Sequence, residues 1–168
     1  EALRGHIASI ATAMPKANSQ RVYLYRLAAD AAIRADDLPL ASDALSKAKR
    51  DLADANLTAP DRAAPQVKRA EAAVAFRSGE PQRAVALLGA RFQRDEKVKE
   101  TDTPRHAVLW LQRALYEIEF DRLAATKSLA ESRAAFTRAG GATPQFKVLV
   151  AYVEARISGN TKAIRDSQ

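Results

Sequence analysis

The residues from Pro65 to Asp95 most constrain what this chain can fold into, because they form two amphipathic segments joined by a short turn. Apolar residues recur at helical spacing on both sides of the turn, at Val67, Ala70 and Val74 before it and at Ala84 and Leu88 after it. The turn itself, Ser78-Gly79-Glu80-Pro81, combines a glycine that can end one helix with a proline that can begin the next. This stretch therefore predicts a helical hairpin.

Similar turn residues and helix-starting prolines recur along the chain. Pro65, Pro104 and Pro144 are each expected to open the first helix of a hairpin, and they are spaced by 39 and then 40 residues. The turns between the two helices of each hairpin are expected at Asp36-Asp37, Gly79-Glu80, Phe120-Asp121 and Gly159-Asn160. Self-similarity at such a period is typical of stacked helical repeats.

This pattern predicts an all-α fold, arranged as a right-handed α-solenoid of stacked hairpins. We expect one helical-repeat domain over residues 1–168. Its parts are a leading helix (1–18), hairpin 1 (19–58), hairpin 2 (64–100), hairpin 3 (103–139) and a truncated hairpin 4 (143–168). Composition favours helix as well, since much of the 47% hydrophobic content is alanine and only 6% of residues are aromatic.

Small and large apolar residues after each turn resemble the tetratricopeptide (TPR) repeats. In that family an alanine packs against the first helix and a larger apolar residue follows one turn later. The matching residues here are Ala41 and Leu45, Gly79 with Ala84 and Leu88, Ala125 and Leu129, and Gly159. The period near 40 departs from the usual length of about 34 residues, so the resemblance implies TPR-like hairpins with longer helices or loops.

The charge of the chain is basic but mixed. Lys and Arg number 27 against 20 Asp and Glu, which gives a net charge of +7 and a pI near 9.9. Acidic residues interrupt nearly every basic cluster, so the sequence favours a solvated surface with a basic bias over a nucleic-acid-binding stripe.

Several classes of chemistry find no support in the sequence. There is no cysteine, and neither His6 nor His106 stands in a metal-binding spacing. No glycine-rich phosphate-binding loop is present. The carboxylates Glu117, Glu119 and Asp121 cluster, but with Arg113 in reach we expect a salt-bridge network at a helix end. We therefore expect no catalytic residue, metal site or cofactor.

The sequence is compatible with more than one cellular compartment. A chain without cysteine suits the bacterial cytoplasm and periplasm equally, and no apolar run reaches the ~20 residues of a membrane span. The chain begins at Glu1 rather than Met. We therefore expect a trimmed chain, a mature secreted product or a domain of a larger protein.

The function predicted is binding of another protein or a peptide, within a larger bacterial regulatory or cell-envelope protein. The residues expected to meet that partner are Tyr23, Arg26, Lys68, Arg69, Arg105, Arg113 and Tyr116, whereas Trp110 is expected in the core. Three alternatives stay open. They are a ligand-sensing regulatory domain, a nucleic-acid-binding repeat, and an envelope lipoprotein domain that activates peptidoglycan synthesis, because Val22 to Leu88 also resembles the helical domains of such lipoproteins.

Overall fold

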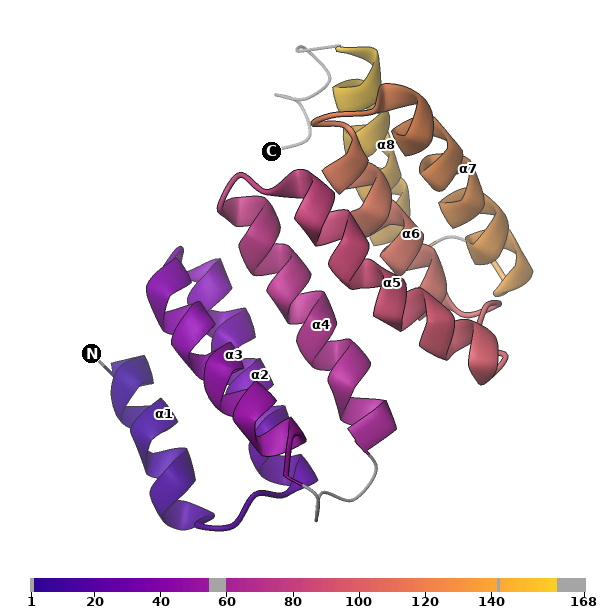
Figure 1. Ribbon diagram of the computed structural model, residues 1–168. Coiled ribbons are helices and arrows are strands. Elements are labelled where there is room, and N and C mark those ends of the chain that lie inside the picture. The colour runs from indigo at the N-terminus through magenta and orange to yellow at the C-terminus, as the bar shows by residue number, and fades with distance from the viewer. Residues whose placement is uncertain (1, 55–59, 142, 160–168) are drawn as a thin grey trace. The chain divides into compact units, whose positions relative to one another are not determined.

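The computed structural model describes residues 2–54, 60–141 and 143–159, and the regular structure of these residues is helical throughout (Figure 1). The all-α prediction is confirmed. The helices are α1 (Ala2–Ala13), α2 (Ser19–Arg34), α3 (Leu38–Leu52), α4 (Pro60–Arg77), α5 (Pro81–Lys97), α6 (Pro104–Glu117), α7 (Arg122–Arg138) and α8 (Pro144–Ser158).

Most helix starts lie where the sequence predicts them, because a local cap determines each one. Asp37, Thr103, Asp121 and Thr143 each accept a hydrogen bond from the backbone N–H three residues later. A side-chain oxygen at this position satisfies one of the amide groups that the first turn leaves without a partner. Pro104 and Pro144 follow directly and lack the N–H that would need a partner.

The predicted start of hairpin 2 needs correction. α4 begins at Pro60, and Pro65 is a buried residue inside it. Both prolines are compatible with the beginning of a helix, but Pro60 takes the first position, where a missing N–H costs nothing. Pro65 therefore does not match Pro104 and Pro144 as the opening residue of a hairpin.

The α2–α3 and α4–α5 turns share one backbone geometry, which the turn between α6 and α7 at Phe120-Asp121 does not have. Asp36 and Gly79 both adopt a left-handed conformation, with φ of 59° and 81°. The amide that follows each one bonds to a carbonyl five residues back, Asp37 to Ala32 at 2.9 Å and Glu80 to Ala75 at 2.9 Å. Asp36 thus occupies the position that glycine takes in the next hairpin, since Asp tolerates this conformation better than most residues.

The chain forms two compact units, Glu1–Arg91 and Phe92–Gln168, and α5 runs through the boundary. In the first unit α2 packs against α3, and both contact α4 (Figure 1). Alanines of α2 and α3 that are almost fully buried let these two helices approach closely. They are Ala28, Ala29, Ala32, Ala41, Ala44 and Ala48. The single domain expected over 1–168 stays a prediction.

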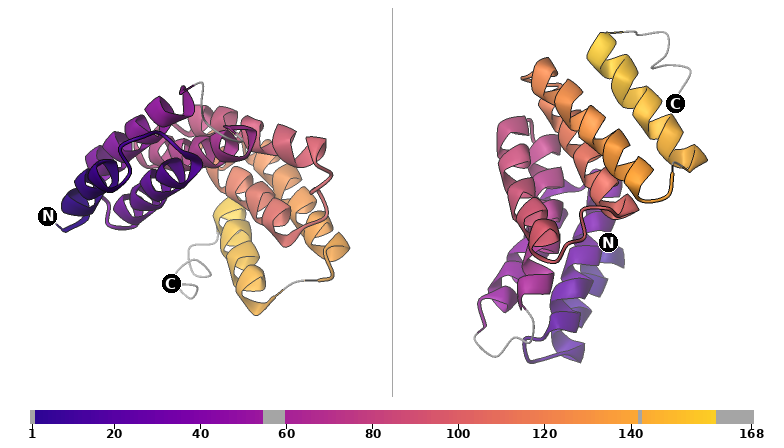
Figure 2. Two further views of the ribbon diagram at one scale, coloured as in Figure 1. Left: turned by 90° about the horizontal axis from the view of Figure 1, so that it is seen from below. Right: turned by 90° about the vertical axis from the view of Figure 1, so that its right-hand side faces the viewer.

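The second unit is built around the pair α6 and α7, which α8 contacts. α7 and α8 lie side by side in both views of Figure 2. Their core includes the stacked rings of Phe136 and Phe146, whose centroids are 3.8 Å apart. Gly140 and Gly141, with φ of 98° and 104°, follow the end of α7. The second helix of hairpin 4, predicted from Thr161, lies outside the described residues.

Six of the eight residues expected to define the repeat are buried, and the two glycines are exposed. Ala41, Ala84 and Ala125 have no exposed surface, and Leu45, Leu88 and Leu129 are at most 5% exposed. Gly79 and Gly159 end their helices in the left-handed conformation. The repeat-defining role of these residues and membership of the TPR family both stay predictions.

Candidate partner-binding surface

Two of the predicted partner-binding residues lie together on α2. Tyr23 is 54% exposed, and the guanidinium of Arg26 lies 5.0 Å from the centre of its ring. Arg26 also forms an ion pair with Asp30, one turn further along. Leu27, four residues after Tyr23, is 38% exposed. This face of α2 therefore presents an aromatic ring and an aliphatic side chain to solvent, beside an ion pair that is largely covered.

The other predicted basic residues are dispersed. Lys68 and Arg69 lie half-buried on α4, and Lys68 Nζ is 3.1 Å from Glu71 Oε2. Arg105 is exposed in the first turn of α6. Arg113 is partly exposed, but its guanidinium lies 5.3 Å from the ring centre of Trp110 and its Nε donates to Glu117 at 2.7 Å.

Tyr116 is not on the surface, contrary to the prediction. Its side chain is 3% exposed, and its hydroxyl accepts a hydrogen bond from Gln112 Nε2 at 2.6 Å. Tyr116 is one of the residues of α6 that face the interior of the unit, so it belongs to the core. Trp110, expected in the core, is half-buried at the edge of a polar cluster described below.

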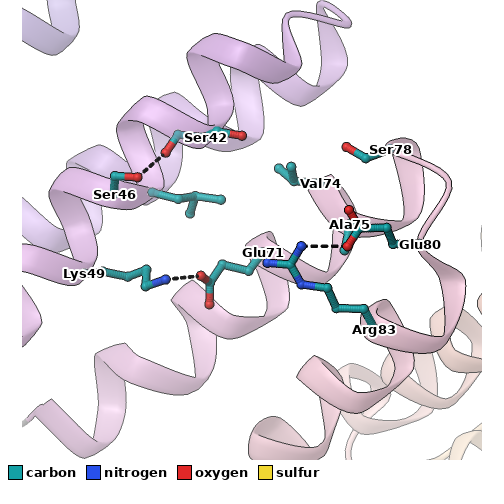
Figure 3. A pocket seen from close by; sticks show the side chains of 10 residues that line it. Ser42, Ser46, Lys49, Glu71, Val74, Ala75, Ser78, Glu80 and Arg83 are labelled. Carbon is teal, nitrogen blue, oxygen red and sulfur yellow. Dashed lines mark hydrogen bonds and ion pairs between the residues drawn. The ribbon is translucent and has the colours of Figure 1, made fainter.

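A groove of about 310 Å³ lies between α3 and α4 and reaches the start of α5 (Figure 3). Leu45 and Val74 contribute apolar surface to it. Its polar lining consists of Ser42, Ser46, Lys49, Glu71, Ser78, Glu80 and Arg83. Two ion pairs border the groove, Lys49 with Glu71 at 2.8 Å and Arg83 with Glu80 at 2.6 Å. Sequence patterns did not identify this groove, because it depends on how α3 and α4 pack.

Glu71 is the most buried charge of this groove, with a side chain only 12% exposed. Burial acts to raise its pKa, but the positive charges of Lys49 and Lys68, which form ion pairs with its two oxygens, outweigh burial and hold the pKa below its ordinary value. Glu71 is therefore ionised at neutral pH, and it orients two half-exposed ammonium groups along α3 and α4.

A second groove, of about 490 Å³, lies between α7 and α8. Its lining is more apolar, with Leu129, Ala130 and Ala155 along it. An ion pair between Arg133 of α7 and Glu154 of α8 spans it. Sequence patterns do not indicate this groove either, because it depends on how α7 and α8 pack.

A buried polar cluster links the end of α5 to α6. Trp110 Nε1 donates to His106 Nε2 at 3.1 Å, and His106 Nδ1 lies 3.1 Å from Asp95 Oδ2. Because an indole N–H can only donate, Nε2 is the acceptor and Nδ1 carries the proton that bonds to Asp95. Arg94 Nη1 lies 3.0 Å from the other oxygen of Asp95. His106 is thus held in one tautomer by fixed protein partners.

The clustered carboxylates are engaged separately. Glu117 is 2% exposed and accepts bonds from Arg113 and from Ser128 Oγ, the latter at 2.6 Å. Glu119 pairs with Arg156 at 2.6 Å, and Asp121 caps α7. The first two are salt bridges near the end of α6, as the sequence predicted.

The part of the chain that the structure describes contains no group of three or more His, Cys, Asp or Glu side chains placed to hold a metal ion. In the same residues, no helix is long and apolar enough to cross a membrane. Comparison with protein-family models, with curated proteins and with solved structures finds no match for this chain.

Proposed function

We propose that this chain is a non-enzymatic scaffold that binds another protein or a peptide. In this proposal its TPR-like hairpins stack as a right-handed α-solenoid, within a larger bacterial regulatory or cell-envelope protein. Stacked hairpins would offer an extended surface on which a partner helix or peptide docks with little change in the scaffold.

The observation that carries the proposal is the exposed face of α2. Tyr23 and Leu27 keep 54% and 38% of their surface exposed, and Arg26 lies over the Tyr23 ring. Tyrosine and arginine are enriched among the residues that dominate the energy of protein interfaces. An exposed aromatic residue beside an exposed leucine also gains more from being covered than a polar helix face does.

The buried polar groups support a binding role over catalysis. His106 donates to Asp95 and accepts from Trp110, and Glu117 is bound by Arg113 and Ser128. A general acid or base must reach a substrate proton. These two groups use their hydrogen-bonding atoms on neighbouring side chains instead.

Photocrosslinking tests this proposal. A photoreactive benzoylphenylalanine replaces Tyr23 in the full-length protein, in cells of the organism that encodes it, and adducts are identified by mass spectrometry. We expect one discrete protein adduct, and we expect Leu27→Glu in the same chain to reduce it about tenfold, because a charge would be buried in the interface.

The control carries the same photoreactive residue at Gln93, which is exposed on α5. Adducts that form equally from Gln93 would show non-specific contact. The absence of any protein adduct from position 23 would also contradict the proposal for this surface.

A further inference from the structure

The α3–α4 groove and the α7–α8 groove are lined by residues at corresponding positions of their helices. Their floors contain Leu45 and Leu129, each four residues after one of the buried alanines Ala41 and Ala125. The matching lining residues are Ser42 with Thr126, Leu45 with Leu129, Ser46 with Ala130, Lys49 with Arg133, Ala75 with Ala155 and Ser78 with Ser158. The two units thus carry two versions of one groove.

A cation on the second helix of a hairpin meets an acid on the following helix in both grooves. Lys49 pairs with Glu71 in one, and Arg133 pairs with Glu154 in the other. The cations remain accessible, with side chains 53% and 51% exposed. An ammonium has three N–H donors and a guanidinium has five, so each cation can bind a further carboxylate beside its present partner.

Both groove faces are more basic than acidic. The lining of the α3–α4 groove carries two cations, Lys49 and Arg83, and two acids, Glu71 and Glu80. Lys68 lies outside the lining but pairs with Glu71 and adds a third cation beside the groove. This excess follows the net charge of +7 of the whole chain.

On α7 and α8 the excess is larger. Exposed Arg122 precedes Thr126 by four residues, and exposed Lys147 precedes Ala151 by four, so both share a helix face with groove residues. With Arg133 they place three basic side chains along the groove face, where Glu154 is the acid that lines the groove. Charge complementarity therefore favours an acidic occupant.

The volumes of the two grooves suit a short peptide segment. Volumes of about 310 and 490 Å³ are in the range of small-ligand sites. They accommodate a few side chains and not a whole helix. The leucine and alanine surfaces suit an aliphatic side chain. The hydroxyl oxygens of Ser42 and Ser78 can accept hydrogen bonds from a peptide backbone. Those of Thr126 and Ser158 can do the same while they donate to carbonyls of their own helices.

We propose that each groove binds a short acidic peptide segment. An aliphatic side chain of the segment lies on the leucine floor, and a neighbouring carboxylate pairs with Lys49 in one unit and with Arg133 in the other. This inference rests on the proposed scaffold function and assigns it a second surface, apart from the α2 face, with a defined partner chemistry.

Titration of the ¹⁵N-labelled protein with a capped pentapeptide, acetyl-Glu-Leu-Glu-Leu-Glu-amide, tests the proposal by NMR. We expect saturable amide shifts at Ser46 and Lys49 and also at Ala130 and Arg133. Replacement of both peptide leucines by serine should weaken binding about tenfold, because the aliphatic contact is lost. A Lys-Leu-Lys-Leu-Lys peptide should produce no saturable shifts, because like charges meet at both grooves.

The same titration with two protein variants tests whether the peptide binds in the grooves. Ser46 and Ala130 are exposed equivalents, so Ser46→Phe and Ala130→Phe fill one groove each while the core is preserved. Each should abolish the shifts in its own unit and leave those in the other. Ala11→Phe on α1, exposed and outside both groove linings, is the matched control.

Three results would overturn the proposal: no saturable shifts with the acidic peptide, equal binding of the basic peptide, or binding that both phenylalanine variants retain. Any of these would leave the scaffold proposal standing if crosslinking from position 23 still captures a partner. Failure of the crosslinking with intact groove binding would count against the α2 face alone.

Discussion

Glu71 is the side chain whose charge most shapes the α3–α4 groove. Lys49 and Lys68 hold its pKa below the ordinary value of 4.5 even though burial opposes them. A carboxyl group whose pKa is lower in the folded state than in the unfolded state releases its proton more readily when folded. Its contribution to stability is therefore complete above pH 4.5 and disappears as the pH falls through the lowered pKa.

Glu71→Gln should consequently destabilise the protein in a pH-dependent way. We expect a loss of about 0.5–1 kcal/mol at pH 7, because both lysine partners are half-exposed and screened by water. The difference from the unmodified protein should shrink steadily below pH 4.5. Urea unfolding followed by circular dichroism at several pH values measures this, and a difference independent of pH would contradict it.

Trp110 is important as a hydrogen-bond donor as well as an aromatic ring. Trp110→Phe keeps a ring against Phe92, whose centroid is 4.5 Å away, but removes the N–H that bonds to His106 Nε2. We expect the free energy of unfolding to fall by about 1–2 kcal/mol, because a buried acceptor loses its partner.

Tyr152→Phe provides the comparison for Trp110→Phe. It also removes one polar group from an aromatic side chain, the hydroxyl bonded to Arg156, but at a half-buried site where water can replace the bond. We expect a change within about 0.5 kcal/mol in the same urea experiment. Equal effects of the two variants would show that burial of His106 Nε2 carries no energetic cost.

At the scale of the element, the turn from α4 to α5 depends on the backbone of Gly79. Its φ of 81° is a conformation that side chains disfavour, although no atom lies within 4 Å of where a Cβ would be. Gly79→Ala should therefore destabilise the protein by about 1–2 kcal/mol through backbone strain alone.

Gly89→Ala should have the opposite effect. Gly89 lies within α5, and a Cβ added there also meets no atom within 4 Å. Alanine is favoured over glycine in a helix by about 0.8–1 kcal/mol, so the unfolding free energy should rise by up to that amount. Thermal or urea unfolding of the two variants checks the contrast, and effects of the same sign would contradict it.

At the scale of the whole molecule, a net charge of +7 suggests attraction to nucleic acid. Many of the basic side chains are nevertheless paired with acids within the described residues. Arg21 pairs with Asp51, Arg77 with Asp36, Arg94 with Glu100, Arg138 with Asp102 and Arg156 with Glu119. Such pairs leave fewer charges to neutralise phosphates.

We therefore expect weak binding of random-sequence RNA that salt abolishes. Fluorescence polarisation with a labelled single strand should detect binding only at low ionic strength and none at about 150 mM salt, because few phosphate contacts form. RNA binding that persists at the higher salt would favour the nucleic-acid-binding alternative.

The sequence by itself determined the helices and most of their ends. Helix starts can be predicted from short stretches of sequence, because each capping side chain accepts a hydrogen bond from the backbone N–H three residues later. The capping residues are Asp37, Thr103, Asp121 and Thr143. The start of α4 was misplaced because two prolines compete for that role and both suit a helix N-terminus.

Only the tertiary structure decided which side chains share an environment. The bond between Asp95 and His106 joins residues of two helices, and the matching grooves depend on how α3 packs against α4 and α7 against α8. Tyr116 is buried, although its position in the helical pattern was also compatible with an exposed, partner-binding side chain. Helical periodicity shows which residues share a face, but the packing partner decides which face is covered, and that depends on residues distant in the sequence.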